Sequence, residues 1–91
     1  MFVYIVSYVI GEHDDELAVA KTLYEKFYSL QFQEGSWILL HPGSADEVLA
    51  LLPLVGFSDS AFVVRLTKRS DIAPFEPVVG IDRFLDFLTA L

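Results

Sequence analysis

An apolar stretch at the start of the chain sets the main condition on the fold. FVYIVSYVI, residues 2–10, contains no charged residue, and its β-branched and aromatic side chains favour a β-strand. Successive side chains of a strand point to opposite faces of its sheet. One face carries Phe2, Tyr4, Val6, Tyr8 and Ile10, and the other carries Val3, Ile5, Ser7 and Val9. Neither face suits water, so the fold must cover both sides of this strand.

The length and composition favour one small domain that contacts other proteins. Ninety-one residues are enough for a single compact domain, residues 1–91, and 54% of them are hydrophobic. No charge-free run is longer than that of residues 1–11, which is shorter than the roughly 20 residues of a membrane-spanning helix. We therefore expect the excess apolar surface to contact another protein. The absence of cysteine and of a signal-peptide pattern predicts a cytoplasmic protein of prokaryotic or phage origin.

Helix and strand patterns follow the first strand. Residues 14–29 predict an amphipathic helix, because acidic residues open it and apolar residues recur at helical spacing. The apolar positions of this helix are Leu17, Ala20, Tyr24 and Phe27. The segment SLQFQEGSWILLH, residues 29–41, predicts a short strand, a tight turn at Glu34 and Gly35, and a second strand over 36–41.

A second helix and a fourth strand complete the pattern. Ser44 is a suitable N-cap, and Glu47 stands three positions later, as in a capping box, so a helix is predicted up to Pro53. The segment AFVVRLT, residues 61–67, has the composition of a strand. The predicted order is therefore βαββαβ.

The end of the chain adds a further helix to this order. Residues 68–80 predict an irregular connector with two prolines, and residues 81–91 predict a C-terminal helix. Its apolar stripe consists of Ile81, Phe84, Leu85, Leu88 and Leu91.

The element order predicts an α/β (α+β) protein with the ferredoxin-like arrangement. Two right-handed βαβ units joined by a hairpin give a four-stranded antiparallel sheet with both helices on one face. The other face is then left for the C-terminal helix, a second copy of the chain, or a ligand that stacks on aromatic rings.

Four segments resemble one known group of proteins. They are YIVSY at residues 4–8, SWILL at 36–40, SADEV at 44–48 and DSAFVVRL at 59–66. In these segments the chain resembles the small SinR-like proteins, which are related to the dimeric CRISPR-associated endonuclease of spacer acquisition. The resemblance covers about residues 1–67 and implies a ferredoxin-like fold and a homodimer.

The chain departs from these relatives at the end of the first strand. The resemblance implies a Tyr-Asp pair there, whose acid binds a divalent metal together with its copy in the second subunit. This sequence has Tyr8 followed by Val9, which offers no oxygen ligand. We therefore expect no metal, no cofactor and no catalysis.

Two other sets of residues could bind a metal or act in catalysis, but a structural role is favoured for each. The densest set of potential metal ligands is Glu12, His13, Asp14, Asp15 and Glu16. Neighbouring residues at a helix start point in different directions, so a solvated helix N-terminus is favoured over a cation site. His41 before Pro42 is interpreted as a turn residue rather than a general base, because no nucleophile motif accompanies it.

Aromatic residues provide the candidate partner surface. The residues assigned to a dimer or partner interface are Tyr4, Tyr8, Val9, Trp37, Phe84 and Leu88. Tyr4, Tyr8, Trp37 and Phe62 would also suit a base-stacking platform, but an aromatic core or dimer seam is favoured because few basic residues accompany them.

The charge balance opposes binding of nucleic acid. The net charge is −7, and the one candidate basic patch consists of Arg65, Lys68 and Arg69. A solvated strand end is favoured over a phosphate clamp for these three residues.

The sequence favours a non-catalytic, homodimeric module that binds another protein or regulates it. One alternative is a metal-dependent nuclease of the related endonuclease type that uses Asp14 or Asp15. Another is an acidic inhibitor whose carboxylates imitate the phosphates of nucleic acid.

Overall fold

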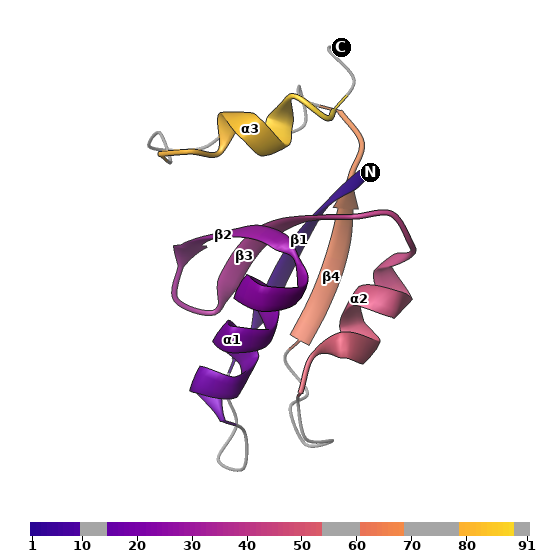
Figure 1. Ribbon diagram of the computed structural model, residues 1–91. Coiled ribbons are helices and arrows are strands. Elements are labelled where there is room, and N and C mark those ends of the chain that lie inside the picture. Colours follow the sequence, from indigo (N-terminus) through magenta and orange to yellow (C-terminus); the bar gives the residue numbers. More distant parts are fainter. Residues whose placement is uncertain (10–14, 54–60, 69–78, 89–91) are drawn as a thin grey trace.

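The apolar first strand, β1, lies inside a four-stranded sheet, as its two apolar faces require (Figure 1). The computed structural model describes residues 1–9, 15–53, 61–68 and 79–88. Its elements are β1 (Phe2–Tyr8), α1 (Glu16–Lys26), β2 (Tyr28–Gln33), β3 (Ser36–His41), α2 (Ala45–Leu51), β4 (Ala61–Leu66) and α3 (Asp82–Leu85).

The sheet has the strand order β2-β3-β1-β4. Both neighbours of β1 run antiparallel to it, so Ile5 lies opposite Ile38 of β3 and Val64 of β4. Strands β2 and β4 form the two edges. The fold is thus a mixed α and β arrangement with an antiparallel sheet, as the order of the sequence patterns predicts.

Helices α1 and α2 cover one face of the sheet. Val19 and Leu23 of α1 and Val48 of α2 are buried in one cluster with the side chains of the strands. The strand residues of this cluster are Tyr4, Val6, Tyr8, Trp37 and Leu39. Burying side chains of this size stabilises the fold by roughly 1.5–3 kcal/mol each.

Helix α3 covers the opposite face. Phe84 and Leu85 are buried there against Val3, Ile38 and Leu40. The C-terminal helix is therefore one of the covers that the apolar first strand needs.

Helix α1 differs from its predicted form at its end and in its buried face. Asp15 is the N-cap and accepts hydrogen bonds from the backbone N–H of Leu17 and Ala18. The helix ends at Lys26 and not at Ser29, because the backbone of Tyr28 and Ser29 pairs with β3.

The apolar stripe predicted for α1 is partly wrong. Leu17 and Tyr24 are exposed, whereas the buried residues are Val19 and Leu23, four positions apart. Both the exposed pair and the buried pair fit helical spacing. The contact of α1 with the sheet determines that Val19 and Leu23 are the buried ones.

The hairpin between β2 and β3 is confirmed at Glu34 and Gly35. Gly35 has a φ of +72°, and a Cβ there would lie 2.3 Å from the carbonyl oxygen of Tyr8. The backbone N–H of Tyr8 in turn donates to the carbonyl of Gly35 at 2.8 Å. Only glycine suits this position, and it ties the turn to the end of β1.

The C-terminal helix is shorter than predicted. It spans Asp82–Leu85. The backbone N–H groups of Phe87 and Leu88 donate to carbonyls three residues earlier, so the chain continues after the helix in tight turns. Residues 89–91 of the predicted helix and 69–78 of the predicted connector lie outside the described residues. Among the described residues, no helix combines the length and apolarity needed to cross a membrane.

Candidate functional site

A cleft of about 290 Å³ lies at the end of β1, where the sequence raised the question of a catalytic acid. It is lined by Tyr8, Val9, Glu16, Glu34 and Gly35. Three elements meet here: the end of β1, the first turn of α1 and the β2–β3 hairpin. Val9 is 65% exposed, so an apolar side chain faces the surface directly after the end of β1.

Tyr8 places a phenol at this cleft. Its hydroxyl accepts a hydrogen bond from Nε1 of Trp37 at 3.1 Å, and both side chains are buried. Burial raises the pKa of Tyr8 above its ordinary value of 10.0, and the charge of Glu16 raises the pKa further, while the hydrogen bond from Trp37 acts in the opposite direction. The phenol is therefore protonated at neutral pH.

The described part of the chain offers no ligand set for a metal at this cleft. No group of three or more His, Cys, Asp or Glu side chains is arranged to hold an ion among the described residues. Asp15 accepts hydrogen bonds at the start of α1, which confirms for that carboxylate the predicted role at the helix N-terminus. Glu12, His13 and Asp14 lie outside the described residues.

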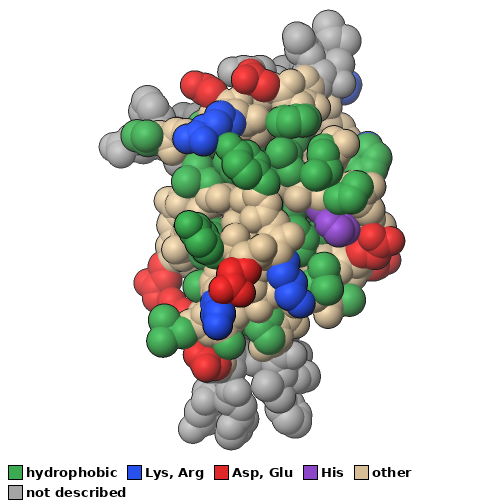
Figure 2. Space-filling view, viewed as in Figure 1, with side chains coloured by type: hydrophobic (Ala, Val, Ile, Leu, Met, Phe, Trp, Pro, Cys, Tyr) green, Lys and Arg blue, Asp and Glu red, His purple; other side chains and the backbone are tan. Residues whose placement is uncertain are grey.

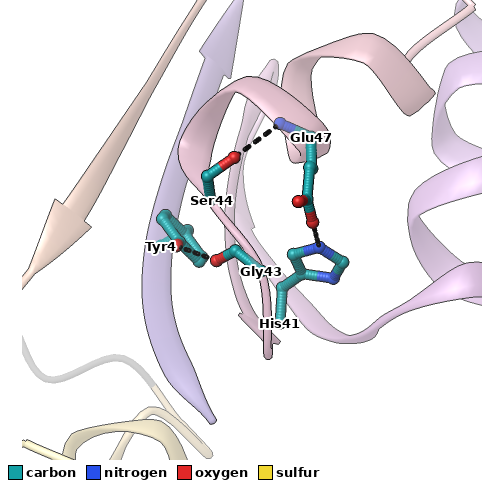
Figure 3. Close-up of polar contacts among 5 residues, drawn as sticks. All are labelled: Tyr4, His41, Gly43, Ser44 and Glu47. Atoms are coloured by element: carbon teal, nitrogen blue, oxygen red, sulfur yellow. Dashed lines mark hydrogen bonds and ion pairs between the residues drawn. The ribbon is translucent and has the colours of Figure 1, made fainter.

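A second polar cluster joins the end of β3 to the start of α2 (Figure 3). Nε2 of His41 lies 3.2 Å from Oε2 of Glu47, and the backbone N–H of Glu47 donates to Oγ of Ser44 at 3.2 Å. The hydroxyl of Tyr4 donates to the carbonyl of Gly43. Ser44 is thus the predicted N-cap, but the Glu47 carboxylate contacts His41 rather than completing a reciprocal capping box.

His41 is the last residue of β3, and two aromatic rings lie near its imidazole. The Phe27 ring lies edge-on to the imidazole at 5.6 Å between centroids, and the Tyr4 ring lies at 6.4 Å. A Cβ at Gly43 would lie 1.7 Å from Oε2 of Glu47, so glycine leaves the space in which this carboxylate reaches His41. The cluster holds β1, β3 and α2 together.

Most of the residues predicted to contact a partner lie inside the chain. Tyr4, Tyr8 and Trp37 are buried beneath α1 and α2, and Phe84 of α3 is buried against the opposite face of the sheet. The remaining two differ: Val9 is exposed, and Leu88 is partly buried against the α3 cluster. The first four side chains thus contribute to the chain's own core.

The base-stacking platform considered from the sequence does not form. Phe62 lies opposite Ser7 in the sheet, so its side chain points to the face opposite Tyr8 and Trp37. Alternation along β1 and β4 separates these aromatic rings.

The candidate basic patch lies at the end of β4. Arg65 and Lys68 are exposed, and Arg69 lies outside the described residues. The guanidinium carbon of Arg65 lies 3.7 Å from the centroid of the Phe2 ring, a cation–π contact. The sequence did not reveal this pair, because only the β1–β4 register brings the two residues together.

Large apolar side chains remain on the surface, and Figure 2 shows hydrophobic side chains among the charged ones on one face of the molecule. The exposed residues include Leu17 and Tyr24 of α1 and Phe62 and Val64 of β4. No single stretch of the sequence indicated this set.

Comparison of the chain with models of known protein families, with curated proteins and with solved structures found no match.

Proposed function

We propose that this chain is a non-catalytic, homodimeric module of prokaryotic or phage origin that binds another protein or regulates it. We propose also that its fold belongs to the ferredoxin-like class. The βαββαβ element order, the sheet order β2-β3-β1-β4 and the position of α1 and α2 on one face support that assignment.

The observation that carries the proposal is the apolar surface left outside the two cores. Val9, Leu17, Tyr24, Phe62 and Val64 are all exposed in the single chain. Covering side chains of this size is favourable by roughly 1.5–3 kcal/mol each when burial is complete. A chain with so much apolar surface beyond its core gains free energy when a protein partner covers part of it.

The strand-end cleft supports a binding role over the nuclease alternative. Val9 supplies no metal ligand at the position that carries an acid in the resembled endonucleases. Asp15, one of the two acids considered as a replacement, holds two backbone N–H groups of α1. Glu16 and Glu34 at the cleft repel a polyanion, as does the net charge of −7.

Light scattering at micromolar concentration tests the dimer, with an expected mass near twice 10.2 kDa. Incubation with single- and double-stranded nucleic acid at low salt, with Mg²⁺ or Mn²⁺, tests the absence of cleavage. Asp14→Ala and Asp15→Ala variants separate a contaminating nuclease from the chain's own activity. Metal-dependent cleavage that disappears with either substitution would show that the protein is a nuclease.

A further inference from the structure

Another cleft, of about 320 Å³, lies between the edge strand β2 and the chain around α3. Residues 28–30 of β2 line it on one side, and Val79, Gly80, Arg83 and Phe84 line it on the other. Pockets that hold small molecules measure roughly 300–1,000 Å³. The volume of this cleft lies at the lower end of that range, so it suits a small ligand.

The walls of this cleft are mainly apolar. The ring of Tyr28 stacks on the ring of Phe84, with 5.2 Å between the centroids and 29° between the planes. Tyr28 is half exposed, and Leu30 and Val79 add aliphatic surface. An aromatic or aliphatic group of a ligand would therefore be covered by apolar side chains on entering the cleft.

Arg83 supplies the positive charge of the cleft. Nη1 of Arg83 donates to the hydroxyl of Tyr28 at 3.1 Å, and Nη2 would lie 3.9 Å from a Cβ placed on Gly80. The guanidinium therefore lies between two residues that line the cleft. Within the described part of the chain, the hydrogen bond to Tyr28 takes one of the five N–H donors of the guanidinium, which leaves others for a ligand.

Charge selects the kind of ligand. No acidic side chain among the described residues lines the cleft, although Asp82 and Asp86 belong to the same stretch of chain. Guanidinium groups pair with carboxylates and phosphates through two parallel hydrogen bonds. A chain with a net charge of −7 repels a dianion about twice as strongly as a monoanion, which favours a carboxylate over a phosphate.

We infer that this cleft binds a small monocarboxylate with an aromatic or aliphatic body, a function beyond the proposed binding of a protein. The carboxylate accepts from the N–H groups of Arg83, and the apolar body packs against Tyr28, Leu30 and Val79. The hydroxyl of Tyr28 holds Nη1 of Arg83 in place for this contact. A free acid and the C-terminal residue of a peptide both present this chemistry.

Two probes test the site and distinguish these sources. Phenylacetate represents the free acid, and N-acetylphenylalanine carries its carboxylate as the last residue of a peptide does. In titrations followed by the backbone amide NMR signals, we expect binding in roughly the millimolar range or tighter, with shifts at Tyr28, Gly80 and Arg83. Phenethylamine, which has the aromatic ring but a positive charge, should bind at least about tenfold more weakly.

Arg83→Gln should raise the dissociation constant of the tighter probe about tenfold or more, because a hydrogen bond between charged groups is lost. Arg65→Gln is the matched control, since it removes the same charge from another exposed arginine that contacts an aromatic ring, at the opposite edge of the sheet. It should leave the dissociation constant within about twofold. Tyr28→Phe keeps the ring and loses the hydroxyl, and it should weaken binding by a smaller factor than Arg83→Gln. Circular dichroism of each variant checks that the fold is kept.

The probe that binds more tightly identifies the source of the carboxylate. Tighter binding of phenylacetate would indicate a free acid, and tighter binding of N-acetylphenylalanine would indicate the C-terminus of a protein. Absence of binding by both probes, equal binding of phenethylamine, or equal effects of Arg83→Gln and Arg65→Gln would overturn the inferred site. These results leave the proposed homodimer unaffected, because light scattering tests it separately.

Discussion

Oε2 of Glu47 lies 3.2 Å from Nε2 of His41, and this contact connects the first turn of α2 to the last residue of β3. The contact depends on Gly43, since a Cβ there would lie 1.7 Å from the same carboxylate oxygen and 2.9 Å from the imidazole nitrogen. The pair explains why a glycine follows His41 and Pro42.

Gly43→Ala should therefore remove the His41–Glu47 contact without unfolding the protein. The Glu47 carboxylate is the end of a flexible, exposed side chain and can move away, so we expect a loss of about 0.5–1 kcal/mol. Urea denaturation of Gly43→Ala, Glu47→Ala and the double variant measures the coupling. Full additivity of the two single effects would show that glycine acts independently of the contact.

Tyr8 should make the protein less stable at alkaline pH. Its folded-state pKa is raised above 10.0, mainly by burial, so its contribution is fully present below pH 10.0 and is lost as the pH rises from there through the folded-state pKa. Tyr8→Phe should reduce this loss of stability at alkaline pH, although it also removes the hydrogen bond from Trp37. Denaturation at several pH values above and below 10.0 tests this, and Tyr24→Phe, at an exposed position, is the control.

The stability of two leucine variants should show which side of α1 is buried. Leu23 is fully buried, and Leu23→Ala should destabilise the fold by roughly 2–5 kcal/mol, whereas Leu17→Ala should change stability by less than about 0.5 kcal/mol. Thermal and urea denaturation of both variants measure the difference. Equal effects would mean that Leu17 also packs against the domain or its partner.

Phe84 should account for much of the contribution of α3 to the stability of the fold. It is buried against the sheet, and Phe84→Ala should cost roughly 3–5 kcal/mol, while Phe87→Ala on the exposed side should cost less than about 0.5 kcal/mol. Deleting residues 80–91 should produce aggregation or loss of the dimer, because Val3 and Leu40 lose their cover. A soluble truncated protein with unchanged mass and melting temperature would contradict the role of this helix.

Features that depend only on neighbouring residues could be predicted from the sequence. Alternation and helical spacing identified the strands and helices, and the predicted range of β3, 36–41, is the observed one. Gly35 marked the hairpin, and Ser44 marked the start of α2, because turn and cap preferences are properties of a few adjacent residues. That Val9 offers no oxygen ligand at the end of the first strand was also visible in the sequence.

Which side chains are buried and which polar groups lie close together depends on contacts between elements that are far apart in the sequence. Helical spacing could not distinguish Leu17 from Val19 as the buried residue, since that depends on where α1 contacts the sheet. The contact of His41 with Glu47 and the meeting of Glu16 with Glu34 at one cleft join separate elements. The aromatic residues predicted to contact a partner are mostly buried because α1 and α2 cover one face of β1 and α3 packs against the other.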